Sequence, residues 1–178
     1  MSSAYSIVKA SPENIPVLPG IEAAAAAKLL KGYIPESILN EVTDENDLYL
    51  AQQEGRLWVA LTEDKKEAGF AMVEIFNSDH VHLVEMDVHP DQGRKGIGRS
   101  MVSAICQWAA ESHYSQVTLT TFCDLPWNAP FYASLGFQVV PTEELTPELL
   151  QILRDEAKRG LDGDRRVAMR YRCTVSIP

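Results

Sequence analysis

Cysteine is scarce in this sequence, and the few cysteines present are far apart. Cys106, Cys123 and Cys173 form no C-x-x-C pair, and no histidine is clustered beside them. Such spacing predicts reduced thiols and no bound metal. An apolar run of membrane-spanning length is absent, and so is a basic leader followed by an apolar core. We therefore expect a cytoplasmic protein with no membrane partner.

Two common phosphate-binding patterns are missing as well. The P-loop needs four residues between its first glycine and a Gly-Lys-Ser/Thr, and no such run occurs. The dinucleotide pattern G-x-G-x-x-G would need a glycine at position 101, where Met101 stands. The spacing therefore argues against a P-loop nucleotide hydrolase and against a dinucleotide-dependent oxidoreductase.

Length and charge set broad limits on the protein. A chain of 178 residues that is 46% hydrophobic is long enough for one hydrophobic core but short for two stable domains. We therefore expect a single domain over residues 1–178. The formal net charge is -9, which favours solubility and would also attract a cationic partner. We expect no nucleic-acid partner, and either a monomer or a homodimer.

Hydrophobic periodicity and turn residues predict an α/β protein. We expect helices in the ranges Ile21–Leu30, within 33–53 with a cap at Thr43 or Asp44, from Ile97 onward, from Asn128, and from Thr146 to Gly160. The expected strands are Tyr5–Ala10, Arg56–Leu61, Ala68–Phe76, Val81–Val88, Gln116–Phe122 and Arg165–Arg172. This order predicts a mixed β-sheet with antiparallel N-terminal strands, a central βαβ unit and helices on both faces.

The stretch from Val81 to Trp108 carries the first functional signal. Glu85 and Asp87 lie two residues apart near the end of a strand, so their side chains share one face. Pro90 then ends the strand, and a glycine-rich turn leads into a helix that opens at Ile97.

This turn has the composition of an anion site. The glycines remove side-chain bulk, so that several peptide N–H groups can point into one concavity at a helix N-terminus. Positively charged side chains are interleaved with them, in a chain that is acidic overall. The residues concerned are Gly93, Arg94, Lys95, Gly96, Ile97, Gly98 and Arg99. We therefore expect a specific phosphate ligand here.

A second signal lies about thirty residues downstream in NAPFYASLGF, residues 128–137. Asn128 is suited to cap a short helix, and Pro130 falls in its first turn. Gly136 fits the left-handed position that ends the helix, and Phe137 begins the next strand. Tyr132, taken alone, would be read as a core aromatic residue.

Together these two stretches resemble the GNAT superfamily of acyl-CoA-dependent N-acetyltransferases. The glycine turn is similar to its Q/R-x-x-G-x-G/A pyrophosphate loop, and NAPFYASLGF looks like its C-terminal motif. One residue departs from the pattern, because Gly93 occupies the Gln/Arg slot between Gln92 and Arg94. The resemblance implies acetyl-CoA as co-substrate, with its pyrophosphate on residues 93–99 and its pantetheine arm along Met86 to Val88.

The same resemblance implies direct transfer of the acetyl group to a primary amine of a small molecule or a peptide. Glu85 is the first candidate for the general base, and Asp87 is the second. An ion pair with a basic residue is the simpler alternative for both. His82 and His89 have suitable chemistry but rank lower.

The other roles follow from the same resemblance. Tyr132 is placed to protonate the leaving thiolate, Asn128 to bind the pantetheine amides, and the Val88 N–H to stabilise charge on the thioester oxygen. An acyl-cysteine intermediate on Cys123 is set aside, because no histidine is placed by the sequence to activate that thiol. The main alternative function is a non-catalytic acyl-CoA-binding or sensing module of the same fold.

Overall fold

The computed structural model describes residues 5–174. It divides into two compact units, one made of residues up to Glu74 together with Val84–Ala104, the other of Ile75–Leu83 and the residues from Ile105 onward. Each unit is described separately below. The expectation of a single domain stays a prediction.

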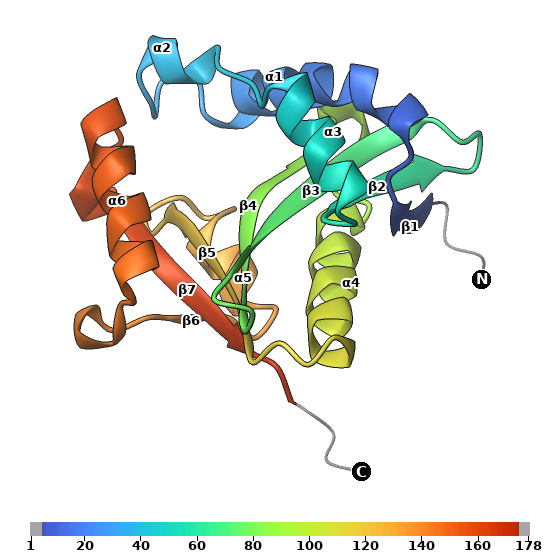
Figure 1. The fold of residues 1–178 in the computed structure, drawn as a ribbon. Coiled ribbons are helices and arrows are strands. Elements are labelled where there is room, and N and C mark those ends of the chain that lie inside the picture. Colours follow the sequence, from blue (N-terminus) through green and yellow to red (C-terminus); the bar gives the residue numbers. More distant parts are fainter. Residues whose placement is uncertain (1–4, 175–178) are drawn as a thin grey trace. The chain divides into compact units, whose positions relative to one another are not determined.

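The strands of the described chain form a mixed seven-stranded sheet in the order β1-β2-β3-β4-β5-β7-β6, which confirms the predicted fold class (Figure 1). The strands are β1 (Tyr5–Lys9), β2 (Leu57–Thr62), β3 (Glu67–Phe76), β4 (His80–Val88), β5 (Gln116–Phe122), β6 (Gln138–Val139) and β7 (Arg166–Arg172). The helices are α1 (Leu18–Leu29), α2 (Glu36–Leu39), α3 (Glu45–Gln53), α4 (Ile97–Glu111), α5 (Ala129–Ala133) and α6 (Pro147–Arg159). Short 3-10 helices occupy Pro12–Val17, Pro90–Gln92, Thr142–Glu144 and Gly163–Arg165.

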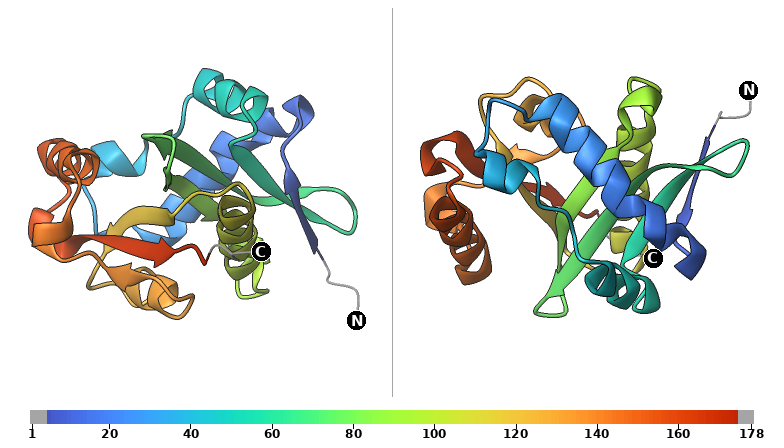
Figure 2. Two further views of the ribbon diagram at one scale, coloured as in Figure 1. Left: turned by 60° about the horizontal axis from the view of Figure 1, so that its bottom comes forward. Right: turned by 90° about the horizontal axis from the view of Figure 1, so that it is seen from above.

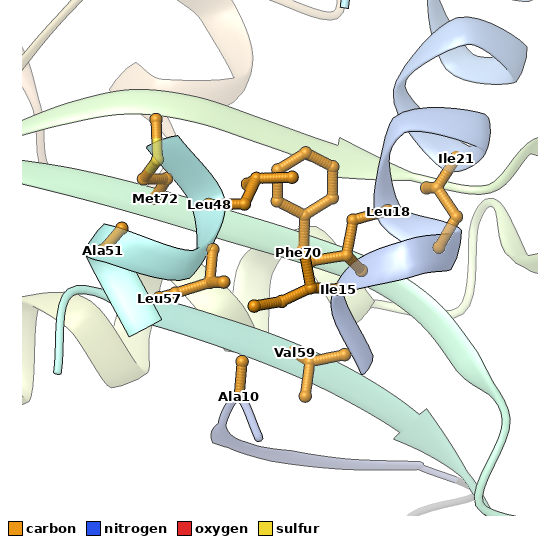
Figure 3. Packing of buried hydrophobic residues seen from close by; sticks show 10 residues of the cluster. All are labelled: Ala10, Ile15, Leu18, Ile21, Leu48, Ala51, Leu57, Val59, Phe70 and Met72. Carbon is orange, nitrogen blue, oxygen red and sulfur yellow. The ribbon is translucent and has the colours of Figure 1, made fainter. Parts of the chain in front are cut away.

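The first unit is built on the antiparallel strands β1, β2 and β3. Alternate residues of β2 and β3, among them Val59 and Phe70, point toward α1, α3 and the first 3-10 helix. Figure 3 shows this cluster, which includes Ile15, Leu18 and Leu48, all fully buried. Burial of large apolar side chains of this kind stabilises a fold by about 1.5–3 kcal/mol each.

The opposite face of the same strands receives α4. A Cβ atom placed on Gly69 would lie 3.3 Å from the Met101 side chain, whereas the neighbouring Phe70 belongs to the α1 and α3 cluster. Since successive strand residues point to opposite faces, the two helix layers lie on opposite faces of β3. The two views of Figure 2 agree, with α1 on one side of these strands and the start of α4 on the other. Helices on both faces were predicted.

The second unit joins the first residues of β4 to β5 in parallel, and β5 to β7 in an antiparallel pair. The parallel pairing covers only three residue pairs, from His80 with Gln116 to His82 with Thr118. Leu149 of α6 packs with Val140 and Ala168 in a small core of this unit. An ion pair between Arg166 and Glu156, with an N–O distance of 2.9 Å, joins β7 to α6.

Local capping explains the limits of α3 and α6. Asp44 accepts the N–H of Asn46 at the start of α3, and Thr146 accepts the N–H of Leu149 at the start of α6. Gly160 ends α6 with a φ of 104°, the left-handed conformation that glycine adopts readily. The helix predicted within residues 33–53 is α3, which begins at the predicted Asp44 cap, whereas the short helix α2 in the same range was not predicted. Pro35 precedes α2 and a separate cap begins α3.

Disulfide bonds and membrane-spanning helices can be looked for among the described residues. Cys106, Cys123 and Cys173 form no disulfide within residues 5–174. Within residues 5–174, no helix combines the length and the apolar composition needed to cross a membrane. The cytoplasmic location stays a prediction.

Candidate active site

The strand, turn and helix predicted around residues 81–108 lie in the order expected. β4 ends at Val88, a 3-10 turn covers Pro90–Gln92, and α4 begins at Ile97. The N–H of His89 donates to the carbonyl of Ala68 at 2.8 Å, which fixes the start of the turn to β3. The ring of His89 caps the turn, because its Nδ1 accepts the N–H of Asp91.

The peptide N–H groups of the turn are the next feature of the site. In the described part of the chain, no backbone or side-chain acceptor is found for the N–H groups of residues 94–98. The φ angles are -61° at Gly93, 61° at Arg94 and 80° at Gly96. Alternation of this kind turns successive N–H groups toward one concave side, which is the geometry of an anion nest. The residues from Gly93 to Gly96 are exposed, so an anion has access to them.

The basic side chains of the turn add positive charge to this nest. Arg94, Lys95 and Arg99 are exposed, and the Lys95 ammonium donates to Gln92 Oε1 at 2.7 Å. Gly96 has both a positive φ and a close neighbour, since a Cβ atom there would lie 3.2 Å from the Tyr5 hydroxyl. Tyr5 in turn hydrogen-bonds to Ser100 on the first turn of α4. The amides and charges of the turn therefore fit a phosphate or pyrophosphate group.

A close backbone approach holds the end of β4, and the sequence analysis missed it. A Cβ atom on Gly69 would lie 2.5 Å from the carbonyl oxygen of Asp87 and 3.2 Å from the Cα of Val88. No side chain fits in this space, so only glycine lets β3 lie this close to β4. The isolated glycine in a strand was a usable signal for such an approach.

The structure brings Glu85 and Asp87 together, as their spacing predicted, and adds a third carboxylate. Glu22 of α1 offers an oxygen that lies within 4.8 Å of oxygens from Glu85 and Asp87. Glu22 also accepts the N–H of Thr43 at 2.8 Å. Glu22 stands more than sixty residues upstream in an alanine-rich helix, so nothing in the sequence pattern pointed to it.

This three-carboxylate cluster disfavours negative charge. Burial is the largest cause that raises the pKa of Asp87 well above its ordinary value of 3.8, followed by the charge of Glu85 and a hydrogen bond with it, and then by the charge of Glu22. Burial also raises the pKa of Glu22. Asp87 Oδ2 is buried and makes no hydrogen bond with any of residues 5–174. The groups that act on Asp87 are thus carboxylates, so the ion pair considered as the simpler alternative is not seen for it.

The histidines of β4 belong to the second unit and are core residues. His80 and His82 are buried, and both hydrogen-bond to the Thr118 hydroxyl, His82 through Nδ1 at 2.9 Å. The ring of Phe76 stacks on His82. Burial lowers the pKa of His82 to about 4, so it is neutral near pH 7.

The second motif forms the expected short helix in the second unit. Tyr132 is half-buried, with edge-on ring contacts to Phe131 and Phe137 at centroid distances of 5.1 and 5.8 Å. Gly136 has the predicted positive φ, 94°, and packs on Tyr171. Phe137 is buried, and β6 begins one residue after it, at Gln138, rather than at Phe137 as predicted.

One detail of this motif differs from the prediction. Asn128 stands at the N-cap position of α5, but its side chain makes no capping hydrogen bond. Its Oδ1 is instead buried and finds no partner among the described residues. A buried amide oxygen without a donor is costly, so it is a natural acceptor for an N–H group of a ligand.

The mixed sheet and the amide-lined turn are features of the class of acyl-CoA-dependent acyltransferases. Comparison with known proteins identifies the family. Residues 25–137, more than half of the chain, match the acetyltransferase (GNAT) family. The chain belongs to this family.

Relatives and solved structures agree with this assignment. The chain is 24% identical over 110 residues to human N-acetyltransferase 8, covering 60% of this chain and 48% of that protein. It is 26% identical over 117 residues to the N-acetylaspartate synthetase of Xenopus tropicalis, covering 66% of this chain and 43% of that protein. The chain thus spans less than half the length of either relative.

The fold is also that of a solved acetyltransferase. The PaiA N-acetyltransferase of Thermoplasma acidophilum, whose crystal structure contains coenzyme A, superposes with a TM-score of 0.75. The match covers 97% of this chain and 99% of that one, at 18% sequence identity. At this identity the likeness establishes the fold alone.

Proposed function

We propose that this protein is an N-acetyltransferase that moves the acetyl group of acetyl-CoA directly to a primary amine of a small molecule or a peptide. The observation that carries the proposal is the exposed turn from Gly93 to Gly96, together with the N–H groups of residues 94–98, for which residues 5–174 offer no acceptor, in a chain of the GNAT family. Peptide amides at the start of a long helix favour a phosphorylated ligand. Coenzyme A is such a ligand.

The donor is assigned to residues of both motifs. Residues 93–99 hold the pyrophosphate, with Arg94, Lys95 and Arg99 supplying charge. Backbone groups from Met86 to Val88 bind the pantetheine arm, and the Val88 N–H donates to the thioester oxygen. One such donor is typically worth about 3 kcal/mol in the transition state. Asn128 Oδ1 is buried and has no hydrogen-bond partner among residues 5–174, which supports its assignment to a pantetheine N–H.

Proton transfer is assigned to the carboxylates and to the tyrosine. An alkylammonium ion has a pKa of about 10.4, so a base must take its proton before the nitrogen can attack near pH 7. Glu85 is the first candidate for this base and Asp87 the second. The neutral nitrogen then attacks the thioester carbon and the carbon–sulfur bond breaks. The CoA thiolate takes a proton from Tyr132, and the second proton that the nitrogen loses as the amide forms passes through solvent to restore the tyrosine hydroxyl. No metal takes part in this scheme.

A free-thiol assay tests the proposal. Acetyl-CoA is offered with polyamines, aminoglycosides, amino acids and peptides, and thiol release is followed together with the mass of the acetylated product. We expect amine-dependent thiol release with at least one of these classes. Binding of acetyl-CoA without thiol release across the whole panel would instead support a non-catalytic acyl-CoA-binding module.

A further inference from the structure

The three-carboxylate cluster of Glu22, Glu85 and Asp87 goes beyond what a general base requires. A base needs one carboxylate, yet three lie together, and one comes from a different layer of the fold. Asp87 Oδ2 is buried and without a partner among residues 5–174, so the cluster contains an acceptor atom that the protein itself leaves unused. A cation that donates a hydrogen bond would satisfy this buried acceptor and offset the negative charge of the two neighbouring carboxylates.

The spacing of the oxygens fits an ammonium group. A tetrahedral ammonium that donates to three oxygens at about 2.8 Å holds them about 4.6 Å apart. A magnesium ion with ligands at about 2.1 Å would hold neighbouring oxygens about 3 Å apart. The three carboxylate oxygens lie no more than 4.8 Å from one another, so one cation can contact all three. This limit includes both separations, and the ammonium is preferred here because the proposed acceptor is an amine.

We propose that Glu22, Glu85 and Asp87 together bind the acceptor as an alkylammonium ion, and that Glu22 makes the protein select aliphatic amines without a carboxylate beside the reacting nitrogen. This inference rests on the proposed function. Glu22 is a specificity-determining residue in this scheme, whereas Glu85 or Asp87 takes the proton. A carboxylate attached to the acceptor would lie beside three carboxyl groups in a partly buried place, where further negative charge is disfavoured.

Glu22 is held in place for this role by contacts of the first unit. The Thr43 N–H donates to Glu22 Oε2 and orients the carboxylate from the segment that precedes α3. Gln at position 22 can still accept this N–H through its amide oxygen, so Glu22→Gln removes the charge and keeps the local contact. Glu63 in the turn between β2 and β3 is exposed, and Glu63→Gln is the matched control for the loss of one negative charge.

The test compares pairs of acceptors that differ by one carboxylate: 3-methylbutylamine with leucine, 2-phenylethylamine with phenylalanine, and agmatine with arginine. For the wild type we expect kcat/KM to be at least tenfold higher for the amine than for the amino acid. Glu22→Gln should lower kcat/KM for the amines at least tenfold, chiefly through KM, and narrow the ratio within each pair. Its acetyl-CoA affinity should stay within a few fold of wild type, and Glu63→Gln should behave as wild type.

The outcomes separate this inference from the proposed function. Thiol release that favours the amino acids, or that is unchanged by Glu22→Gln, overturns the inference and leaves the acetyltransferase proposal intact. Absence of thiol release with every acceptor counts against the proposed function, and calorimetry with 2-phenylethylamine in the presence of coenzyme A then decides the inference alone. Binding by wild type and not by Glu22→Gln supports the cation site, whereas no binding, or equal binding by both, refutes it.

Discussion

The most direct structural prediction concerns Gly69, because the neighbouring atoms leave no space for a methyl group on its Cα. In Gly69→Ala the new Cβ would lie 2.5 Å from the Asp87 carbonyl oxygen, closer than real Cβ contacts occur. The nearest atoms belong to the β4 backbone, so the strand itself must move. Overpacking of this kind typically costs 1–3 kcal/mol; we expect about 2 kcal/mol, which lowers Tm by about 4–8 °C in a chain of this size.

The assay is thermal unfolding followed by circular dichroism, with Gly20→Ala as the matched control. Gly20 lies in α1, and a Cβ atom there would meet nothing within 4 Å. Alanine in a helix interior is favoured over glycine by about 0.5–1 kcal/mol, so the control should be slightly more stable than wild type. If Gly69→Ala proves as stable as wild type, the close approach of β3 to β4 is wrong.

Three further predictions concern function. Gly69→Ala should lower kcat at least tenfold in the thiol-release assay, because displacement of Val88 misplaces the donor for the thioester oxygen; an unchanged kcat would argue against that role. Tyr132→Phe should reduce kcat well below wild type and leave acetyl-CoA affinity within a few fold, and equal turnover would defeat the acid assignment. Gly96→Glu should abolish acetyl-CoA binding in calorimetry, through strain at a positive φ, contact with Tyr5 and like charge; unchanged affinity would contradict the phosphate site.

Features of the site that depend only on residues close together in the sequence were predictable. β5 has the predicted bounds, and α4 begins at Ile97 as the glycine spacing and the apolar periodicity indicated. Glu85 and Asp87 share a face because strand geometry alone requires it.

Features that depend on contacts distant in the sequence were not predictable in this way. Glu22 reaches the carboxylates from α1, and an alanine-rich helix carries no pattern that indicates which face meets β4. Asn128 occupies a cap position without making the cap bond, because backbone angles there, φ -108° and ψ -104°, differ from those of a capping residue. Its local sequence could not reveal that.

Asp87 gives a final prediction, on stability and pH. Its raised pKa means that the folded state binds this proton more tightly than the unfolded chain, whose aspartates titrate near 3.8. The contribution of Asp87 to the free energy of unfolding therefore falls as the pH rises above about 3.8 and through the higher folded pKa. Asp87→Asn has a similar shape and no charge, so it should match wild type at acid pH and become more stable than wild type as the pH approaches 8.

Thermal unfolding between pH 4 and pH 8 measures this difference. The exposed Asp64→Asn is the control, and its Tm difference from wild type should stay nearly constant with pH. A variant that is more stable yet less active would show that the carboxylate is retained for chemistry at a cost in stability, as binding and catalytic sites often require. A pH-independent difference for Asp87→Asn, or a loss of stability at pH 8, would mean that Asp87 is ionised without strain in the folded protein and that the carboxylate cluster needs no cation.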